Sequence, residues 1–265
     1  MAVLAPGHET LNDAAPGRAP ERSKMPRTLL TIAVLLAVAG CPKPAAGPEL
    51  DPPEWAATEI TQLRVIAGGD TVGDHIIQLH RVEHDGVPAL NIITETMAGT
   101  ADHITHDSAW VLVRLPNLRP VHSARRISNP EMDMTFELVY GREQVRVTAL
   151  GPDGPEGLDL PFGPLDFDNE QVTTLIRALP LEPDEPFGFN IIIGAVGMKV
   201  PAELELIGNE TVEVPVGTFE CRRVRLTIAG QSVDIWYELD GLRRLVRYEA
   251  PVAELVMELV ASVVN

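Results

Sequence analysis

The sequence predicts a mainly β protein in which a strongly curved antiparallel sheet, a half-barrel-like meander, holds one short helix against its concave side. Apolar and polar residues alternate along many stretches, as expected of strands with one buried face. Turn signals such as Asp85-Gly86 and Asp240-Gly241 separate these stretches. Clear helical spacing is limited to the stretch DNEQVTTLIRAL, residues 168–179.

The N-terminal part of the chain has the pattern of a bacterial lipoprotein signal. The run from Thr28 to Ala39 is mostly apolar and too short to span a bilayer core, which needs roughly 20 apolar residues. It leads into VAGC, which resembles a lipobox where the thiol of Cys41 receives diacylglycerol and the preceding bond is cut. Acyl chains on Cys41 would anchor the protein to a membrane.

This signal divides the chain into four predicted segments. Residues 1–24 are interpreted as a misannotated or extended leader, because Met25 and Arg27 begin a signal peptide of ordinary form that covers residues 25–40. Residues 41–54 are predicted as the lipidated cysteine and a Pro-rich tether. Residues 55–265 are predicted to form a single periplasmic β domain.

The mature chain is strongly acidic. Residues 1–40 hold 4 of the 21 basic and 3 of the 38 acidic residues, so 17 basic and 35 acidic residues remain, with a net charge of about −18. Such a surface repels phosphate backbones, which argues against nucleic acid as a partner. It also argues against peripheral binding to anionic headgroups, so the lipid is expected to be the anchor.

Strands are predicted in order along the domain. The first half contains long alternating stretches, with a hairpin turn at Asp85-Gly86, and the helix at 168–179 has Asp168 or Asn169 as its N-cap. In the second half, residues 198–206 alternate, Gly208-Asn209 predicts a tight turn, and residues 212–216 form the return strand. The last stretch, 252–263, suits either a helix or a strand.

The next strand, in GTFECRRVRLTIAG, changes its parity. Phe219 and Cys221 begin an inward set that resumes one residue out of step at Val224. A bulge near Arg222-Arg223 would explain the shift.

Two stretches carry a resemblance to a known family. GNETVEVPVGTFECRRVRL followed by DIWYELDGLRRLVRYEAP resembles the domain of unknown function 3108 family of Gram-negative envelope proteins, and Leu118-Arg119-Pro120 is similar to that family as well. The likeness extends over most of residues 57 to 260. It implies a curved half-barrel like that of lipoprotein carriers and a strand at the C-terminus, and it brings no catalytic residues to transfer.

The sequence contains none of the motifs that announce common enzyme chemistry, such as G-x-S-x-G, H-E-x-x-H or a P-loop. In DHITHD, an extended chain would send His103 and His106 to opposite faces. We therefore expect no enzyme activity, no catalytic residues, no metal site and no cofactor. Once Cys41 is acylated, Cys221 is the one remaining cysteine and is interpreted as a small buried hydrophobe.

The best candidate for binding is the stretch PFGFNIIIGAVGMKV. Its alternate residues form an apolar row which, with the next inward pair, predicts a hydrophobic ligand site of Phe187, Phe189, Ile191, Ile193, Phe219 and Cys221. The row is also typical of a plain core strand covered by the helix.

Two functions remain. The first is a non-enzymatic lipoprotein of the cell envelope, facing the periplasm from the outer membrane, that binds a lipid or other hydrophobic ligand in envelope biogenesis. The second is a structural or protein-interaction module of an envelope complex that has no small-molecule ligand. The two differ in whether the apolar row faces a cavity or the covering helix.

Overall fold

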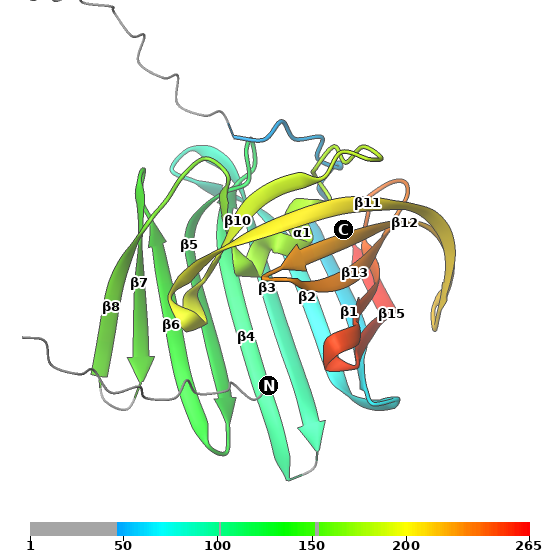
Figure 1. The fold of residues 1–265 in the computed structure, drawn as a ribbon, viewed down its shortest axis with the longest axis horizontal. Coiled ribbons are helices and arrows are strands. Elements are labelled where there is room, and N and C mark those ends of the chain that lie inside the picture. Colours follow the sequence, from blue (N-terminus) through cyan, green and yellow to red (C-terminus); the bar gives the residue numbers. More distant parts are fainter. Residues whose placement is uncertain (1–46, 101, 152–153) are drawn as a thin grey trace, which may run out of the picture. The chain divides into compact units, whose positions relative to one another are not determined.

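The computed structural model describes residues 47–100, 102–151 and 154–265. The leader, the signal peptide and Cys41 lie outside these residues. Within them the chain forms one 15-stranded sheet in the order β8-β7-β6-β5-β4-β3-β2-β1-β15-β14-β13-β12-β11-β10-β9. All neighbours pair antiparallel except β9 and β10, which are parallel. The predicted curved antiparallel sheet with one short helix is confirmed (Figure 1).

The first half of the sheet is a meander in which each strand pairs with the next. Its strands are β1 (Thr58–Ala67), β2 (Asp70–His84), β3 (Val87–Thr100), β4 (His103–Arg114), β5 (Arg119–Asn129), β6 (Met132–Tyr140), β7 (Gln144–Gly151) and β8 (Gly154–Pro161). The predicted turn at Asp85-Gly86 joins β2 to β3, with positive φ angles of 52° and 72° that suit a tight hairpin turn.

The second half is a meander that runs back toward the first. Its strands are β9 (Asp166–Asp168), β10 (Phe187–Ile193), β11 (Met198–Val214), β12 (Gly217–Ile228), β13 (Gln231–Glu238), β14 (Leu245–Ala250) and β15 (Leu255–Val264). The first strand of the domain, β1, pairs with the last, β15, so the two halves join at the middle of one sheet. The C-terminal stretch, which the sequence left open, is therefore a strand.

One short helix lies inside the curve of the sheet. A 3₁₀ turn, η1 (Asn169–Gln171), leads into α1 (Val172–Ile176), and the side chain of Asp168 caps η1 by accepting from the backbone N–H of Glu170. Both halves of the sheet form hydrogen bonds with this segment. Gln171 donates to the carbonyl of Leu118, while the hydroxyl of Tyr237 donates to the carbonyl of Thr173.

The interior is divided by β10, which is buried on both faces. Ile191 packs into the main core, formed by β1 to β4, α1 and the strands from β9 to β14. Ile192 faces a second cluster, built on β6 and β7 around Phe136 and Val147. The strand therefore acts as a wall between two apolar layers. A 3₁₀ turn, η2 (Gly194–Val196), continues this contact toward β6 and β7.

The turn predicted at Gly208-Asn209 is wrong. Strand β11 continues through this pair to Val214, and the chain reverses at Pro215-Val216. Gly208 instead lies at a register irregularity opposite β12, with a φ of 144° that only glycine adopts easily. A Gly-Asn pair signals backbone freedom, and here that freedom makes a bulge rather than a reversal.

The bulge predicted at Arg222-Arg223 is also misplaced, because the irregularity lies in the partner strand β11. Strand β12 itself alternates regularly, with no shift against β13. Val224 and Leu226 face the main core, whereas Phe219 and Cys221 point to the opposite face. There they join a third cluster with Val212, Val214, Trp236, Val246 and Leu259.

The described residues before β1 lie against the domain. Leu50 packs on the main core, and the backbone N–H of Asp51 donates to the carbonyl of Ala178 over 2.7 Å. Trp55 is buried in the same core. These contacts begin several residues before residue 55, where the sequence placed the start of the domain. In the part of the chain that the structure describes, no helix has the length and apolar character to cross a membrane.

Candidate functional site

The apolar row predicted from the sequence is packed inside the protein. Phe189 and Ile191 are 4% and 0% exposed, while Phe187 and Ile193 are half-buried against the same core. The Phe189 ring lies 5.9 Å from the Phe187 ring and 6.1 Å from the Phe167 ring, centroid to centroid. These four residues of β10 thus share one face, and that face is covered.

The other two residues of the predicted site lie elsewhere. Phe219 and Cys221 are on β12, in the third cluster, and their side chains are on the face of the sheet opposite the main core. Burial raises the pKa of the Cys221 thiol to about 12, with nearby carboxylates such as Glu238 adding to the shift. The structure therefore does not bring the six predicted residues into one site.

Two other sequence candidates were Cys41 and the pair of histidines in DHITHD, and the structure places only the histidines. Cys41, the predicted lipidation site, lies outside the described residues. His103 and His106 stand three residues apart on β4, paired with Thr100 and Met97 of β3. Within residues 47–100, 102–151 and 154–265, no three His, Cys, Asp or Glu side chains gather closely enough to hold a metal ion.

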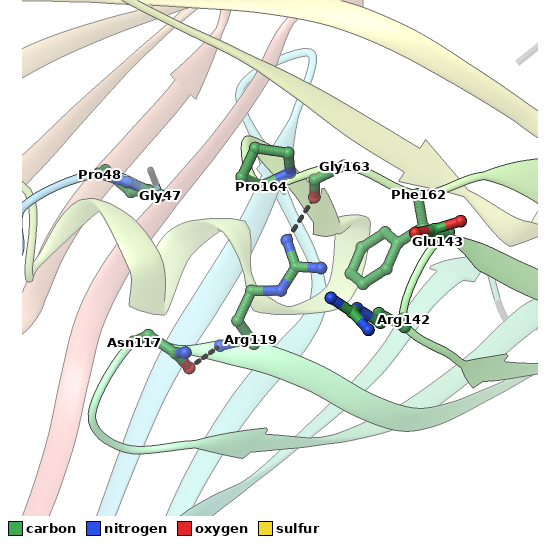
Figure 2. Close-up of a pocket in the computed structure, with 9 residues that line it drawn as sticks. All are labelled: Gly47, Pro48, Asn117, Arg119, Arg142, Glu143, Phe162, Gly163 and Pro164. Carbon is green, nitrogen blue, oxygen red and sulfur yellow. Dashed lines mark hydrogen bonds between the residues drawn. The ribbon is translucent and has the colours of Figure 1, made fainter. Parts of the chain in front are cut away.

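A site that the sequence reading missed lies at one end of the sheet. Two adjoining hollows of about 480 and 450 Å³ share Asn117, Arg119, Arg142 and Phe162 among their lining residues. We call the two hollows together the arginine cleft; its further lining residues are Gly47, Pro48, Arg114, Pro120, Val121, Tyr140, Gly141, Glu143, Gly163 and Pro164. Figure 2 shows the guanidinium groups of Arg119 and Arg142 beside the Phe162 ring.

The cleft is built from hairpin ends. The β4–β5 turn supplies Asn117 and the β6–β7 turn supplies Arg142, while the chain between β8 and β9 supplies Phe162 and Gly163. The described chain also begins here, because Gly47 and Pro48 line the same hollow. In Figure 1 this first segment crosses the end of the domain where these turns lie. Segments from distant parts of the sequence therefore converge on one cleft.

Arg119 is the fixed member of the cleft. Its guanidinium lies 3.9 Å from the centroid of the Phe162 ring and donates to the carbonyl of Gly163. Its backbone N–H donates to Oδ1 of Asn117 over 3.1 Å. Burial lowers the pKa of Arg119, and the carboxylate of Asp166 opposes that change. The charge is thus partly removed from water without a direct ion pair.

The wall of the cleft is held in place by Asp166, which is 2% exposed. Its Oδ2 accepts from the backbone N–H of Gly163 over 2.6 Å and from Nζ of Lys199 over 3.0 Å. Its Oδ1 accepts from the amide of Asn190 over 2.7 Å. Both oxygens are therefore engaged, and the loop that carries Phe162 and Gly163 is fixed before any ligand arrives.

The remaining arginines of the cleft have no acidic partner in the part of the chain that the structure describes. Arg114 and Arg142 are exposed, and among the described residues neither has a carboxylate within salt-bridge distance. Arg114 also stands directly opposite Arg119 in the register of β4 and β5, where like charges repel. Of the lining residues, only Glu143 is acidic. In so acidic a chain, three arginines at or next to the ends of predicted strands were the feature of the sequence that could have indicated this site.

A second polar cluster lies behind the cleft, under η1. Asp168 is 1% exposed; its Oδ2 accepts from the hydroxyls of Ser123 and of Tyr140, the latter over 2.5 Å. Burial raises the pKa of Asp168 and raises that of Tyr140 well above its ordinary value. Arg125 continues the cluster by pairing with both Asp107 and Glu170. The side chains of this cluster are joined to one another by hydrogen bonds and ion pairs, so they anchor η1 to β4, β5 and β6.

Fold and site together define a class: a protein with one open, curved antiparallel sheet wrapped round a short helix, bearing an arginine-lined cleft at one end. The chain belongs to the family described as protein of unknown function (DUF3108), whose model matches residues 62–260. This confirms the family expected from the resemblance. None of the curated proteins matches the sequence.

Two solved structures are similar to this one. The crystal structure of a β-barrel-like protein of domain of unknown function DUF1849 from Brucella abortus is 8% identical, with a TM-score of 0.53 over 79% of this chain and 98% of that chain. At this identity the likeness concerns the fold alone. A protein with a YmcC-like fold from Bacteroides fragilis NCTC 9343 is 10% identical over 81% and 99% of the two chains, but its TM-score is 0.26.

Proposed function

We propose that the protein is a non-enzymatic lipoprotein of the cell envelope that acts as an interaction module, through the surfaces at the ends of its sheet. The lipobox-like VAGC, the apolar run before it and the Pro-rich stretch after it support acylation at Cys41 and a position in the periplasm, with the outer membrane as the anchoring membrane. No motif in the sequence supports a catalytic function or a cofactor.

One observation favours the interaction module over a carrier of a hydrophobic ligand. Ile191, at the centre of the row proposed for a hydrophobic ligand, is 0% exposed and packs in the main core with the residues of α1. A carrier of acyl chains needs an apolar cavity that is open or can open. Because protein side chains already occupy this face, the interaction module is the better supported function.

Native mass spectrometry of the periplasmic form, with Cys41→Ser to prevent acylation, tests this choice. We expect the mass of the polypeptide alone and capture of an envelope protein by cross-linking in cells. A co-purified lipid that survives gentle desolvation would instead favour the carrier. A separate mass measurement on the native protein tests the anchor, because acylation adds the mass of the lipid to a chain that begins at Cys41.

A further inference from the structure

We propose that the arginine cleft is a binding site for a phosphate group. The cleft presents three guanidinium groups, from Arg114, Arg119 and Arg142, in two adjoining hollows. Guanidinium groups offer forked N–H donors that match the oxygens of phosphate, and such charge-assisted bonds are among the strongest hydrogen bonds in proteins.

Two positive charges lie close together in the cleft. Arg114 and Arg119 face each other across β4 and β5, which costs free energy unless an anion lies between or beside them. Elsewhere in the described chain most surface arginines have acidic partners, such as Arg126 with Asp133 and Arg146 with Asp159. Arg81 and Arg222 also lack an acidic partner, but their side chains donate to backbone carbonyls. Within the described residues, Arg114 and Arg142 differ in having neither kind of partner.

Part of the cleft is rigid before binding. Stacking on Phe162 and the bond to the Gly163 carbonyl hold Arg119, and the contacts of Asp166 hold the loop that carries both residues. A fixed donor loses little conformational entropy when it binds an anion. Arg114 and Arg142 are exposed, and within the described residues neither side chain has a hydrogen-bond partner that would have to be released on binding.

The net charge of the protein does not prevent such binding. The full sequence has a net charge of −17, which repels anions at long range. At physiological ionic strength, exposed charges are screened beyond about 8 Å. The potential within the cleft is therefore set by the three arginines, by Glu143 and by the Asp166 carboxylate behind the wall, whose charge Lys199 offsets.

The proposed acylation of Cys41 indicates which phosphate groups lie nearest to the cleft, and this part of the inference rests on that proposed function. Cys41 lies six positions before Gly47, and an extended chain covers about 3.5 Å per residue, so the connection spans at most about 21 Å. Gly47 itself lines the cleft. An acylated Cys41 would therefore hold the cleft close to phospholipid headgroups, whose phosphate is the ligand we expect first. A soluble phosphate compound has the same chemistry.

Calorimetric titration of the Cys41→Ser periplasmic form with inorganic phosphate tests the site without any lipid anchor. We expect saturable binding that Arg142→Gln weakens about tenfold, because one charge-assisted bond is lost. Arg119→Gln should abolish it, although this change also removes packing on Phe162. The exposed Arg142 and Arg114 therefore supply the decisive variants. Arg146→Gln, on the same β6–β7 hairpin but outside the cleft, is the matched control and should bind as the parent does.

A second set of measurements identifies the source. The unacylated Cys41→Ser form should sediment with vesicles of phosphatidylethanolamine and phosphatidylglycerol. Arg142→Gln in that form should reduce the sedimented fraction, and added inorganic phosphate should compete with the vesicles. Binding of free phosphate without binding of vesicles would assign the cleft to a soluble phosphate compound. Absence of saturable binding to both, equal binding of acetate, or unchanged binding by Arg142→Gln and Arg114→Gln would overturn the proposal. An unacylated Cys41 would overturn the anchor and leave the titration result unaffected.

Discussion

Glu59 and Arg177 form a two-pronged ion pair inside the domain, with oxygen-to-nitrogen distances of 3.0 and 2.8 Å and side chains that are each 4% exposed. Glu59 lies on the central strand β1 and Arg177 follows the last residue of α1. Arg177 also donates to the carbonyl of Leu242 and lies 4.9 Å from the Trp55 ring centroid. The pair thus ties the end of the helix to the middle of the sheet.

Breaking this pair should strongly destabilise the protein. Glu59→Gln leaves the Arg177 guanidinium buried without a counter-charge, and we expect the free energy of unfolding to fall by about 3–5 kcal/mol. The double variant Glu59→Met with Arg177→Met should cost less than the sum of the single variants. Urea denaturation measures all three. Asp133→Asn, in an exposed pair with Arg126, should leave the midpoint unchanged. A Glu59→Gln midpoint that does not move would contradict the burial of the pair.

Enlarging the centre of the apolar row should overpack the core. Ile191→Trp adds bulk where the side chain is 0% exposed, and we expect a loss of about 1–3 kcal/mol in the free energy of unfolding. Ile104→Trp is the matched control, because Ile104 lies on β4 with 40% exposure. Thermal melts compare the two. Equal melting temperatures for the Ile191→Trp variant and the parent would indicate empty space beside Ile191. That result would favour the function of a lipid carrier.

His75 should make stability depend on pH. Burial lowers the pKa of His75 to about 4, from 6.5 for an unperturbed histidine, while Asp107 opposes the shift. Between pH 6.5 and 4 the unfolded chain binds a proton that the folded protein does not, so the contribution of neutral His75, complete above pH 6.5, is lost as the pH falls.

Urea denaturation at pH 7 and pH 5 tests this, with His75→Gln as the comparison. The parent should lose more stability on acidification than the variant, by no more than about 1.4 kcal/mol per pH unit, the limit for one proton. Burial raises the pKa values of Asp168 and Glu170, which act in the opposite direction. Both proteins contain these groups, so the difference isolates His75. Identical pH profiles would show that His75 is solvated.

Cys221 should react with thiol reagents only when the protein opens. It is 0% exposed, and its raised pKa keeps the thiol protonated at pH 8. We expect slow labelling by iodoacetamide in buffer and complete labelling in urea, followed by mass spectrometry. The Cys41→Ser form is used so that Cys221 is the single thiol. Rapid labelling of the native protein would show that the third cluster opens readily.

The sequence was informative wherever one face of a strand is apolar. The alternation from Met198 to Leu206 predicted its strand, and Asp85-Gly86 predicted its turn, because both signals are local. Gly208-Asn209 misled because a glycine that frees the backbone serves a bulge as well as a reversal, and the choice depends on pairing with β12. The faces of Phe219 and Cys221 followed from that same pairing.

The sequence shows the three arginines, but it does not show that they meet in one cleft. Arg114 and Arg142 are separated by the strands β5 and β6 and by the turns before each of them, and the loop that carries Phe162 follows β8. Only the curvature and order of the sheet bring these segments to one end. By contrast, the packing of Ile191 was visible as an alternative in the sequence, since an apolar row suits a covered core strand as well as an open groove.

The pairing of β1 with β15 also determines when the fold can be completed. During synthesis, the hairpins of the first half can form outward from β1 to β8, but the other edge of β1 waits for the final strand, which has 10 residues. A chain that stops before Leu255 would leave the edges of β1 and β14 bare in the middle of the sheet, as templates for aggregation. Strand β15 therefore joins the two halves, and the continuous sheet forms only when this strand is in place.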